Sequence, residues 1–238
     1  DLRVHKKVEG LKTLNIAAVS DLHLGTLVGA GRVRAMAEIM RKLDPDIVLF
    51  AGDILDEDMA PAVCRNICGG MENVQPRFGF FTVPGNHEHY GGMSRALAYL
   101  TEHHITVLRD EVVKIDDSFY IVGREDPGHG GEPENKRKPL NELLAGIDST
   151  RPIILIDHQP FHLEEATENG VDLQISGHTH HGQLWPVNYI TRKTYEISHG
   201  YKLKGQTHFY VSSGFGTWGP PIRTNSRPEI VNIRLTFD

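Results

Sequence analysis

Gly85-Asn86-His87-Glu88-His89 is the stretch that decides how this 238-residue sequence can fold. It follows an apolar run at residues 78–83, and four other short apolar runs also lead into polar side chains. Runs of this length and composition are typical of strands buried on both faces. Each of the five delivers an Asp, Asn or His at its carboxyl end. We therefore expect the ends of the strands to build a metal site.

The other four runs supply candidate metal ligands of different kinds. They lead into Asp21 and His23, into Asp53, into His158, and into His178 and His180. Asp21 and His23 are two residues apart, so in an extended loop both can face one ion. Asp53 follows Gly52, which lets the backbone come close and leaves the carboxylate free to bridge two ions. Asn86 adds a neutral amide oxygen.

The combined ligand set contains nitrogen and oxygen donors but no thiolate. Such a set suits a pair of divalent ions such as Mn, Fe or Zn, whereas calcium or magnesium alone prefers an all-oxygen site. A structural zinc site would be closed and usually contains Cys, so this pattern favours a catalytic site. A lone Asp-x-His or Gly-Asp occurs by chance, but five such segments in one order are hard to explain that way.

Composition places the chain among soluble globular proteins, with 39% hydrophobic and 24% charged residues. We expect one domain over residues 1–238, because we find neither an internal repeat nor a long linker. The net charge of -6 offers no overall basic surface for nucleic acid. No run is long and apolar enough to span a membrane.

The chain begins at Asp1 without a Met or a signal-peptide pattern. We expect an excised or processed soluble domain, which a preceding segment could tether to a membrane. The compartment is not predicted. Cys64 and Cys68 are interpreted as two small buried residues of one helix rather than a disulfide.

The order of the elements predicts a sheet covered by helices. Strands are expected at 14–20, 46–51 and 77–83, alternating with helices at 31–43, 60–67 and 93–100. Three short strands at hairpin spacing follow, at 105–108, 112–115 and 119–122. The remainder is expected to contain helices at 140–147 and 161–169, strands at 153–156 and 171–176, and β structure from residue 183 onward.

The five blocks together resemble the signature of the calcineurin-like metallophosphoesterases, over residues 14–235. The resemblance implies an α/β (α+β) fold of four layers, in which two packed mixed β-sheets are flanked by helices. It also implies two metal sites that share one carboxylate. The first ion would be held by Asp21, His23, Asp53 and His180, and the second by Asp53, Asn86, His158 and His178.

The resemblance further implies hydrolysis of a phosphomonoester, phosphodiester or pyrophosphate bond by a hydroxide that bridges the two ions. His87 corresponds to the family's histidine beside the substrate phosphate, where it would stabilise charge or protonate the leaving oxygen. The family often has Asp after this histidine, as its hydrogen-bond partner. Here that residue is Glu88, which is one methylene longer, and the resemblance implies that Glu88 is a catalytic residue that orients the His87 ring.

Four residues are weaker candidates for substrate contacts. His89 and His181 adjoin ligand blocks and could instead be solvated loop histidines, while Arg124 could pair with a phosphate or form a surface ion pair. Residues 128–131 resemble a flexible rim. In the turn-rich tail 212–223, Phe215 and Trp218 either pack over the edge of the site or form a wall of the substrate pocket, with Arg223 nearby.

This tail is similar to a subfamily often attached to N-terminal membrane segments, some of whose members resemble UDP-2,3-diacylglucosamine hydrolases. We therefore expect a phosphohydrolase, with a lipid-linked or nucleotide-sugar phosphoester among the candidate substrates. Contact with a membrane surface would come through segments outside this chain. A nuclease is an alternative, but it would need a basic, aromatic groove, and the net charge of -6 argues against one. A non-catalytic scaffold would be expected to lose metal ligands, and all of them are present here.

Overall fold

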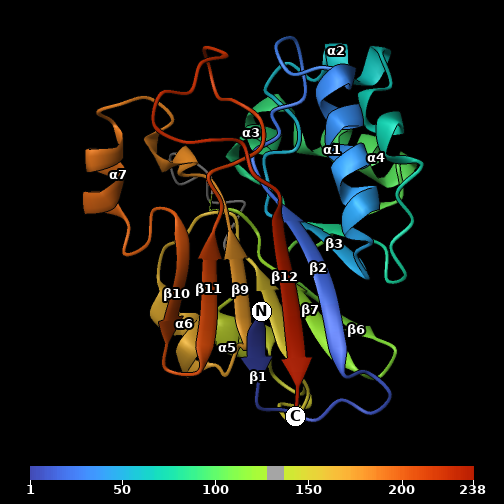
Figure 1. The fold of residues 1–238 in the computed structure, drawn as a ribbon, viewed down its shortest axis with the longest axis vertical. Coiled ribbons are helices and arrows are strands. Elements are labelled where there is room, and N and C mark those ends of the chain that lie inside the picture. Colours follow the sequence, from blue (N-terminus) through green and yellow to red (C-terminus); the bar gives the residue numbers. More distant parts are fainter. Residues whose placement is uncertain (128–136) are drawn as a thin grey trace.

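Alternate side chains of strand β2 (Thr13–Val19) pack into two different hydrophobic layers. Ile16 and Ala18 face one layer, whereas Ala17 and Val19 face the other. A strand buried on both faces can be accommodated only when a sheet is covered on both sides. The computed structural model, which describes residues 1–127 and 137–238, achieves this by packing two sheets together under outer helices (Figure 1).

The first sheet has six strands in the order β1-β12-β2-β3-β4-β5. Strands β2 to β5 run parallel, β12 pairs antiparallel with β2, and β1 pairs parallel with β12. The remaining strands of this sheet are β1 (Leu2–Val4), β3 (Ile47–Phe50), β4 (Phe80–Thr82), β5 (Ile105–Val107) and β12 (Val231–Phe237).

The second sheet also has six strands, in the order β10-β11-β9-β8-β7-β6. Its four central strands run parallel, and each edge strand pairs antiparallel with its neighbour. The strands are β6 (Glu111–Ile115), β7 (Phe119–Gly123), β8 (Ile153–Ile156), β9 (Leu173–Ser176), β10 (Gly200–Lys204) and β11 (Thr207–Val211).

Helices complete the outer layers. The first sheet packs against α1 (Ala30–Leu43), α2 (Ala60–Cys64), the 3-10 turn Ile67–Met71 and α4 (Met93–Glu102). The second packs against α5 (Leu140–Leu143) and α6 (Leu163–Glu168). The layers are therefore helix, sheet, sheet, helix, which confirms the expected fold class. None of the described helices is long and apolar enough to cross a membrane.

Several expected elements differ from the structure. The helix expected over 60–67 ends at Cys64, because Asn66 adopts a left-handed backbone conformation; Cys64 is consequently exposed and only Cys68 is buried. β5 pairs with β4 of the first sheet, so two of the three strands expected at hairpin spacing, β6 and β7, form a hairpin. α7 (Asn188–Thr194) was not expected within a β region. The rim at 128–131 lies outside the described residues.

Candidate metal centre

All seven predicted metal ligands follow the carboxyl ends of strands, at the upper edge of the two sheets (Figure 1). β2, β3 and β4 of the first sheet lead to Asp21 and His23, to Asp53, and to Asn86, which begins α3 (Asn86–Gly91). β8 and β9 of the second sheet lead to the remaining three, His158, His178 and His180. Each sheet therefore contributes part of the site, as parallel strands that end at one edge allow.

The backbone at five of these ligands lies in the left-handed region. The φ angles are positive at Asp21, His23, Asp53, His178 and His180. Such conformations cost on the order of 1 kcal/mol or more at each non-glycine residue, and they cluster at functional sites. Cross-loop hydrogen bonds hold the first three in place: Asp21 N donates to Gly52 O (3.1 Å), and His23 N donates to Asp53 O (3.0 Å).

Gly52 is required by the close approach of the two sheets at this point. A Cβ atom added there would lie 2.5 Å from Nδ1 of His158, and the φ angle of Gly52 is +81°. Any other residue would displace the imidazole. The glycine therefore brings the loop after β3 against His158, in agreement with the close backbone approach that the sequence predicts for this position.

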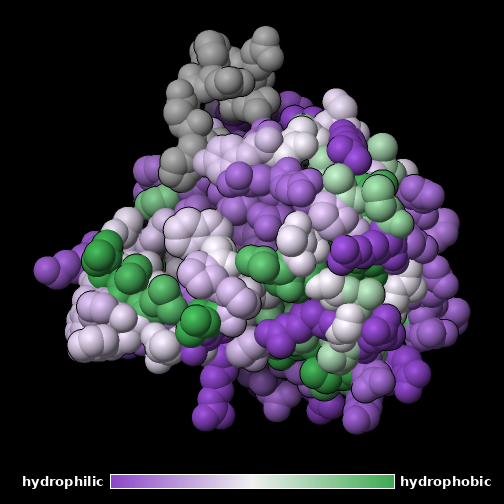
Figure 2. All heavy atoms as spheres, turned by 90° about the horizontal axis from the view of Figure 1, so that it is seen from above, coloured by the Kyte–Doolittle hydropathy of each residue, from purple (hydrophilic) through white to green (hydrophobic). Residues whose placement is uncertain are grey.

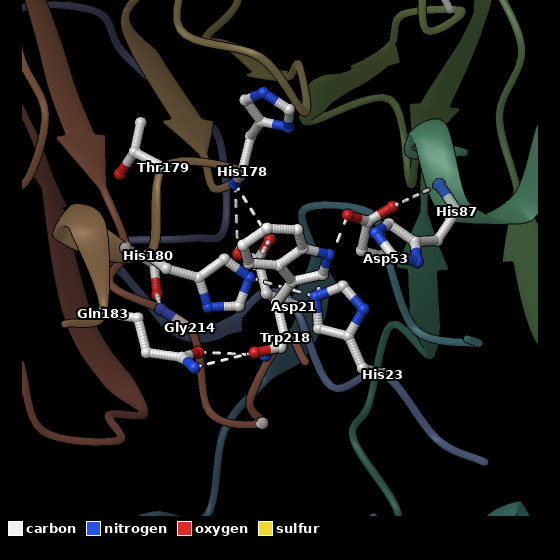
Figure 3. A network of polar contacts seen from close by, with 12 residues as sticks. Asp21, His23, Asp53, His87, His178, Thr179, His180, Gln183, Gly214 and Trp218 are labelled. Atoms are coloured by element: carbon white, nitrogen blue, oxygen red, sulfur yellow. Dashed lines mark hydrogen bonds and ion pairs between the residues drawn. The ribbon is translucent and has the colours of Figure 1, made fainter. Parts of the chain in front are cut away.

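Asp21, His23 and His180 form the first group of possible ligands (Figure 3). Their ligating atoms all lie within 4.8 Å of one another. Nε2 of His23 is 3.0 Å from Nε2 of His180, which in turn is 3.5 Å from Oδ1 of Asp21. Three donors from both sheets therefore point to one small space.

Asp53, His158 and His178 form the second group, within the same limit of 4.8 Å. Asn86 joins it through Oδ1, which is 2.9 Å from Nδ1 of His178 and 3.2 Å from Nε2 of His158. Oδ2 of Asp53 is 3.1 Å from His158 Nε2 and 4.0 Å from His23 Nε2, so this carboxylate reaches toward both groups. Nδ1 of His158 donates to Ala51 O, which leaves Nε2 to face the site.

Burial and charge divide the histidines into two kinds. Burial lowers the pKa of His23 to about 4 and holds the pKa of His180 well below its usual value, so both rings are neutral, the form that binds metals. Burial also opposes a charge on His158, but the facing Asp53 carboxylate outweighs it and raises the pKa of that ring well above normal. Burial raises the pKa of Asp21 to about 6.

The structure corrects the expected partner of His87. Nδ1 of His87 donates to Oδ1 of Asp56 at 3.2 Å. Burial lowers the pKa of His87, but this hydrogen bond and the nearby carboxylates outweigh burial and raise the pKa above its usual value. Glu88 instead turns away and accepts hydrogen bonds from backbone N–H groups of the loops on either side. Sequence reasoning missed Asp56, although its place three residues after Asp53 is a usable signal.

Three of the residues expected to contact substrate do not line the cavity, and each of them contacts another side chain instead. His89 pairs with Glu125 (Nε2–Oε1 2.9 Å), and His181 lies 3.2 Å from Ser198 Oγ. Arg124 is buried rather than on the surface, and its guanidinium contacts Asp110 Oδ1 at 3.2 Å. These contacts argue against a direct role for the three in binding substrate.

Arg223 supports the site from behind. Its guanidinium donates to the carbonyl oxygens of Ser213 (2.8 Å) and Gly214 (3.2 Å), and Nη2 lies 3.4 Å from Nδ1 of His180. It does not line the cavity, so the expected substrate contact is replaced by a contact with a candidate ligand.

A cavity of about 420 Å³ opens above the two ligand groups. Its floor includes His23, Asp53, Asn86, His87, His178 and His180. Its walls are largely apolar or aromatic and include Tyr90, Leu184, Val187, Tyr195, Trp218 and Pro220. Of the two tail aromatics, Phe215 is buried in the core and Trp218 forms part of this wall.

Gln183 fixes the position of Trp218. Its side-chain amide donates to Trp218 O (2.7 Å) and accepts from Trp218 N (2.9 Å) (Figure 3). Gln183 is itself buried and follows the loop that carries His178 and His180. Sequence reasoning missed Gln183 and Tyr195, because a single amide or aromatic residue in a loop gives no local signal.

Comparison with known proteins identifies relatives over nearly the whole chain. An uncharacterized metallophosphoesterase of Helicobacter pylori strain J99 is 33% identical over 94% of this chain, and this chain spans 60% of its length. A transmembrane protein with metallophosphoesterase domain from Danio rerio is 31% identical over 99% of this chain, which spans 56% of that protein. This chain thus spans little more than half the length of these two relatives.

Solved structures share the fold at low sequence identity. The protein TT1561 of Thermus thermophilus is 12% identical, with a TM-score of 0.55 over 86% of this chain and 92% of that one. A 5'-nucleotidase precursor from the same organism is 16% identical, with a TM-score of 0.52 over 94% of this chain and 54% of that one. The family described as calcineurin-like phosphoesterase matches residues 14–182. This chain therefore belongs to the calcineurin-like phosphoesterase family.

Proposed function

We propose that this chain hydrolyses a phosphoester with the help of two divalent ions, chosen from Mn, Fe and Zn. The observation that carries the proposal is the placement of Asp53 between the two ligand groups. Asp21, His23, Asp53 and His180 would hold the first ion, and Asp53, Asn86, His158 and His178 the second. The donor set fits this use, because neutral imidazoles, carboxylates and an amide oxygen suit such ions and no thiolate is present.

Such a pair of ions would supply an activated water and would neutralise charge on the phosphate oxygens. The residues of the chain then have separate roles. Asp53 and Asn86 would hold metal ions, and His87, which lines the cavity beside them, would protonate the leaving group. Because Asp56 holds Nδ1 of His87, Nε2 is left to donate a proton to the leaving oxygen. Tyr90 extends the wall beside this ring, with the two ring centres 5.8 Å apart.

The cavity favours a small or apolar phosphoester over a nucleic acid. The described residues that line it include neither Lys nor Arg, and a nuclease would need basic side chains along a groove. Its apolar wall suits a lipid-linked or aromatic leaving group. The transmembrane relative of Danio rerio supports, by analogy, a substrate located at a membrane. A lipid-precursor pyrophosphatase similar to UDP-2,3-diacylglucosamine hydrolases is therefore the second candidate.

The test is hydrolysis of p-nitrophenyl phosphate and bis-p-nitrophenyl phosphate, with Mn added or with chelator. We expect Mn-dependent turnover that falls ~10²–10⁴-fold in His87→Ala. His5→Ala is the control, because His5 is exposed and lies on the N-terminal arm. Turnover unaffected by chelator would contradict the proposal. Two bound ions without any turnover of either ester would favour a scaffold.

A further inference from the structure

The segment at one side of the cavity mouth carries an exposed apolar surface that the hydrolysis does not explain. Trp185, Tyr189 and Ile190, which we call the α7 face, are 67%, 57% and 64% exposed. Figure 2, which looks down on the site end of the molecule, shows a band of hydrophobic residues over α7 at the left. Large apolar side chains gathered in this way usually mark a surface that contacts a partner or a membrane.

The α7 face is continuous with the cavity. Val187 and Thr191 both line the cavity. They are four residues apart, so they lie on the same side of α7. Tyr189 and Ile190 do not line the cavity and are open to solvent. Trp218 is 59% exposed and also lines the cavity. Exposed apolar side chains from two segments therefore border the cavity.

The charges around this surface select one kind of partner. α7 contains Arg192 and Lys193, both exposed, and no acidic residue, although the chain as a whole has a net charge of -6. The nearby carboxylate of Glu196 is occupied by Lys202 and Lys204. Aromatic side chains next to basic ones match the interface of a bilayer that contains anionic lipids.

We propose that the α7 face and Trp218 dock on an anionic lipid bilayer and hold the mouth of the cavity against it. This deepens the proposed function, because the substrate would then be a phosphoester presented at the membrane. The contact is made by residues of this chain, and it does not depend on any membrane segment elsewhere in a longer protein.

The chain contains two tryptophans, Trp185 and Trp218, and both lie on the proposed surface. Intrinsic fluorescence is therefore a direct reporter of docking. The 238-residue chain is titrated with vesicles of phosphatidylcholine, with or without phosphatidylglycerol, and binding is measured in parallel by co-sedimentation. We expect a blue shift of the emission, and binding that requires phosphatidylglycerol and weakens as salt is added.

Two double variants separate the apolar and basic contributions. Tyr189→Ser with Ile190→Ser should weaken vesicle binding at least ~10-fold. Arg192→Gln with Lys193→Gln should weaken it ~30-fold, because each basic residue near an anionic surface contributes about fivefold. The matched control is Ile39→Ser with Leu203→Ser, two exposed aliphatic residues on α1 and β10. It should bind vesicles like the wild type.

Vesicle binding that is absent in the wild type, or equally weakened in the control, overturns the proposal. So does a dimer in solution that the first α7 variant abolishes, since the face would then cover a second copy. Turnover of p-nitrophenyl phosphate, a water-soluble probe, should be unchanged in both α7 variants. If the vesicles bind but this ester is not hydrolysed, the docking surface stands and the proposed function fails.

Discussion

Glu88 should act on stability rather than on the chemical step, and its conversion to Gln tests this. The side chain is 2% exposed. Its Oε2 accepts from Gly85 N (2.8 Å) and Asp53 N (3.1 Å), and its Oε1 accepts from Leu55 N (2.9 Å). The two oxygens together hold three backbone donors from two loops. Gln has the same shape but offers only one oxygen.

The cost of Glu88→Gln can be estimated from these contacts. The remaining oxygen can keep the Gly85 and Asp53 donors, while the amide NH₂ would face the N–H of Leu55. One buried donor without an acceptor costs ~1–3 kcal/mol. For a chain of this size each 1 kcal/mol lowers Tm by ~2–4 °C, so Tm should fall by ~2–12 °C. Glu88→Ala would strand three donors at ~3–9 kcal/mol, which approaches the ~5–15 kcal/mol stability of a whole domain.

Thermal unfolding followed by circular dichroism, with Mn held constant, measures this effect. The control is Glu102→Gln at the exposed end of α4, which should change stability by no more than ~0.5 kcal/mol. Well below its Tm, Glu88→Gln should lose less turnover than His87→Ala. An unchanged Tm together with abolished turnover would refute the reasoning, because Glu88 would then be a catalytic group.

Three further predictions concern the site and its surroundings. Asp56→Asn should lower kcat ~10-fold with little change in KM, because it weakens the hydrogen bond that favours protonated His87 and such a bond contributes ~1.4 kcal/mol; steady-state kinetics measures this. His180→Ala should reduce metal content from two ions to one per chain, measured by elemental analysis after dialysis. Burial raises the pKa of Glu125, but hydrogen bonds, including one from His89, outweigh burial and lower it. The contribution of Glu125 to stability is therefore full above pH ~4.5 and is lost below it. The difference in urea unfolding between wild type and Glu125→Gln should stay constant from pH ~7 to ~4.5 and shrink as the pH falls further.

The strand ends were predictable because their signal is local. A short apolar run followed by Asp, Asn or His needs no knowledge of the partner strand, and the covered sheets follow from strands that are apolar on both faces. The hydrogen-bond partner of His87 could not be predicted from such a local pattern. It depends on where α3 begins relative to the loop after β3, and this geometry places Asp56 rather than Glu88 beside the ring.

Other misses have the same physical origin. Arg124 carries no sequence mark of burial, yet it forms a buried ion pair with Asp110, 14 residues earlier. β5 and β6 are close in sequence, but they join different sheets because β5 extends the parallel series after β4. α7 is short, and it packs against the 3-10 turn His180–Gly182, a contact that the β spacing around it does not report. In each case a long-range contact decides the outcome, and no local pattern reports it.

The candidate site joins the two sheets as well as lying above them. The backbone N–H of His178, from the second sheet, donates to both carboxylate oxygens of Asp21 from the first, at 3.0 and 3.1 Å. His158 of the second sheet donates to Ala51 O of the first. Because either sheet alone holds only part of each ligand group, any change that shifts the sheets against each other must separate donors. Substitutions in the core between the sheets should therefore weaken metal binding even where they contact no ligand.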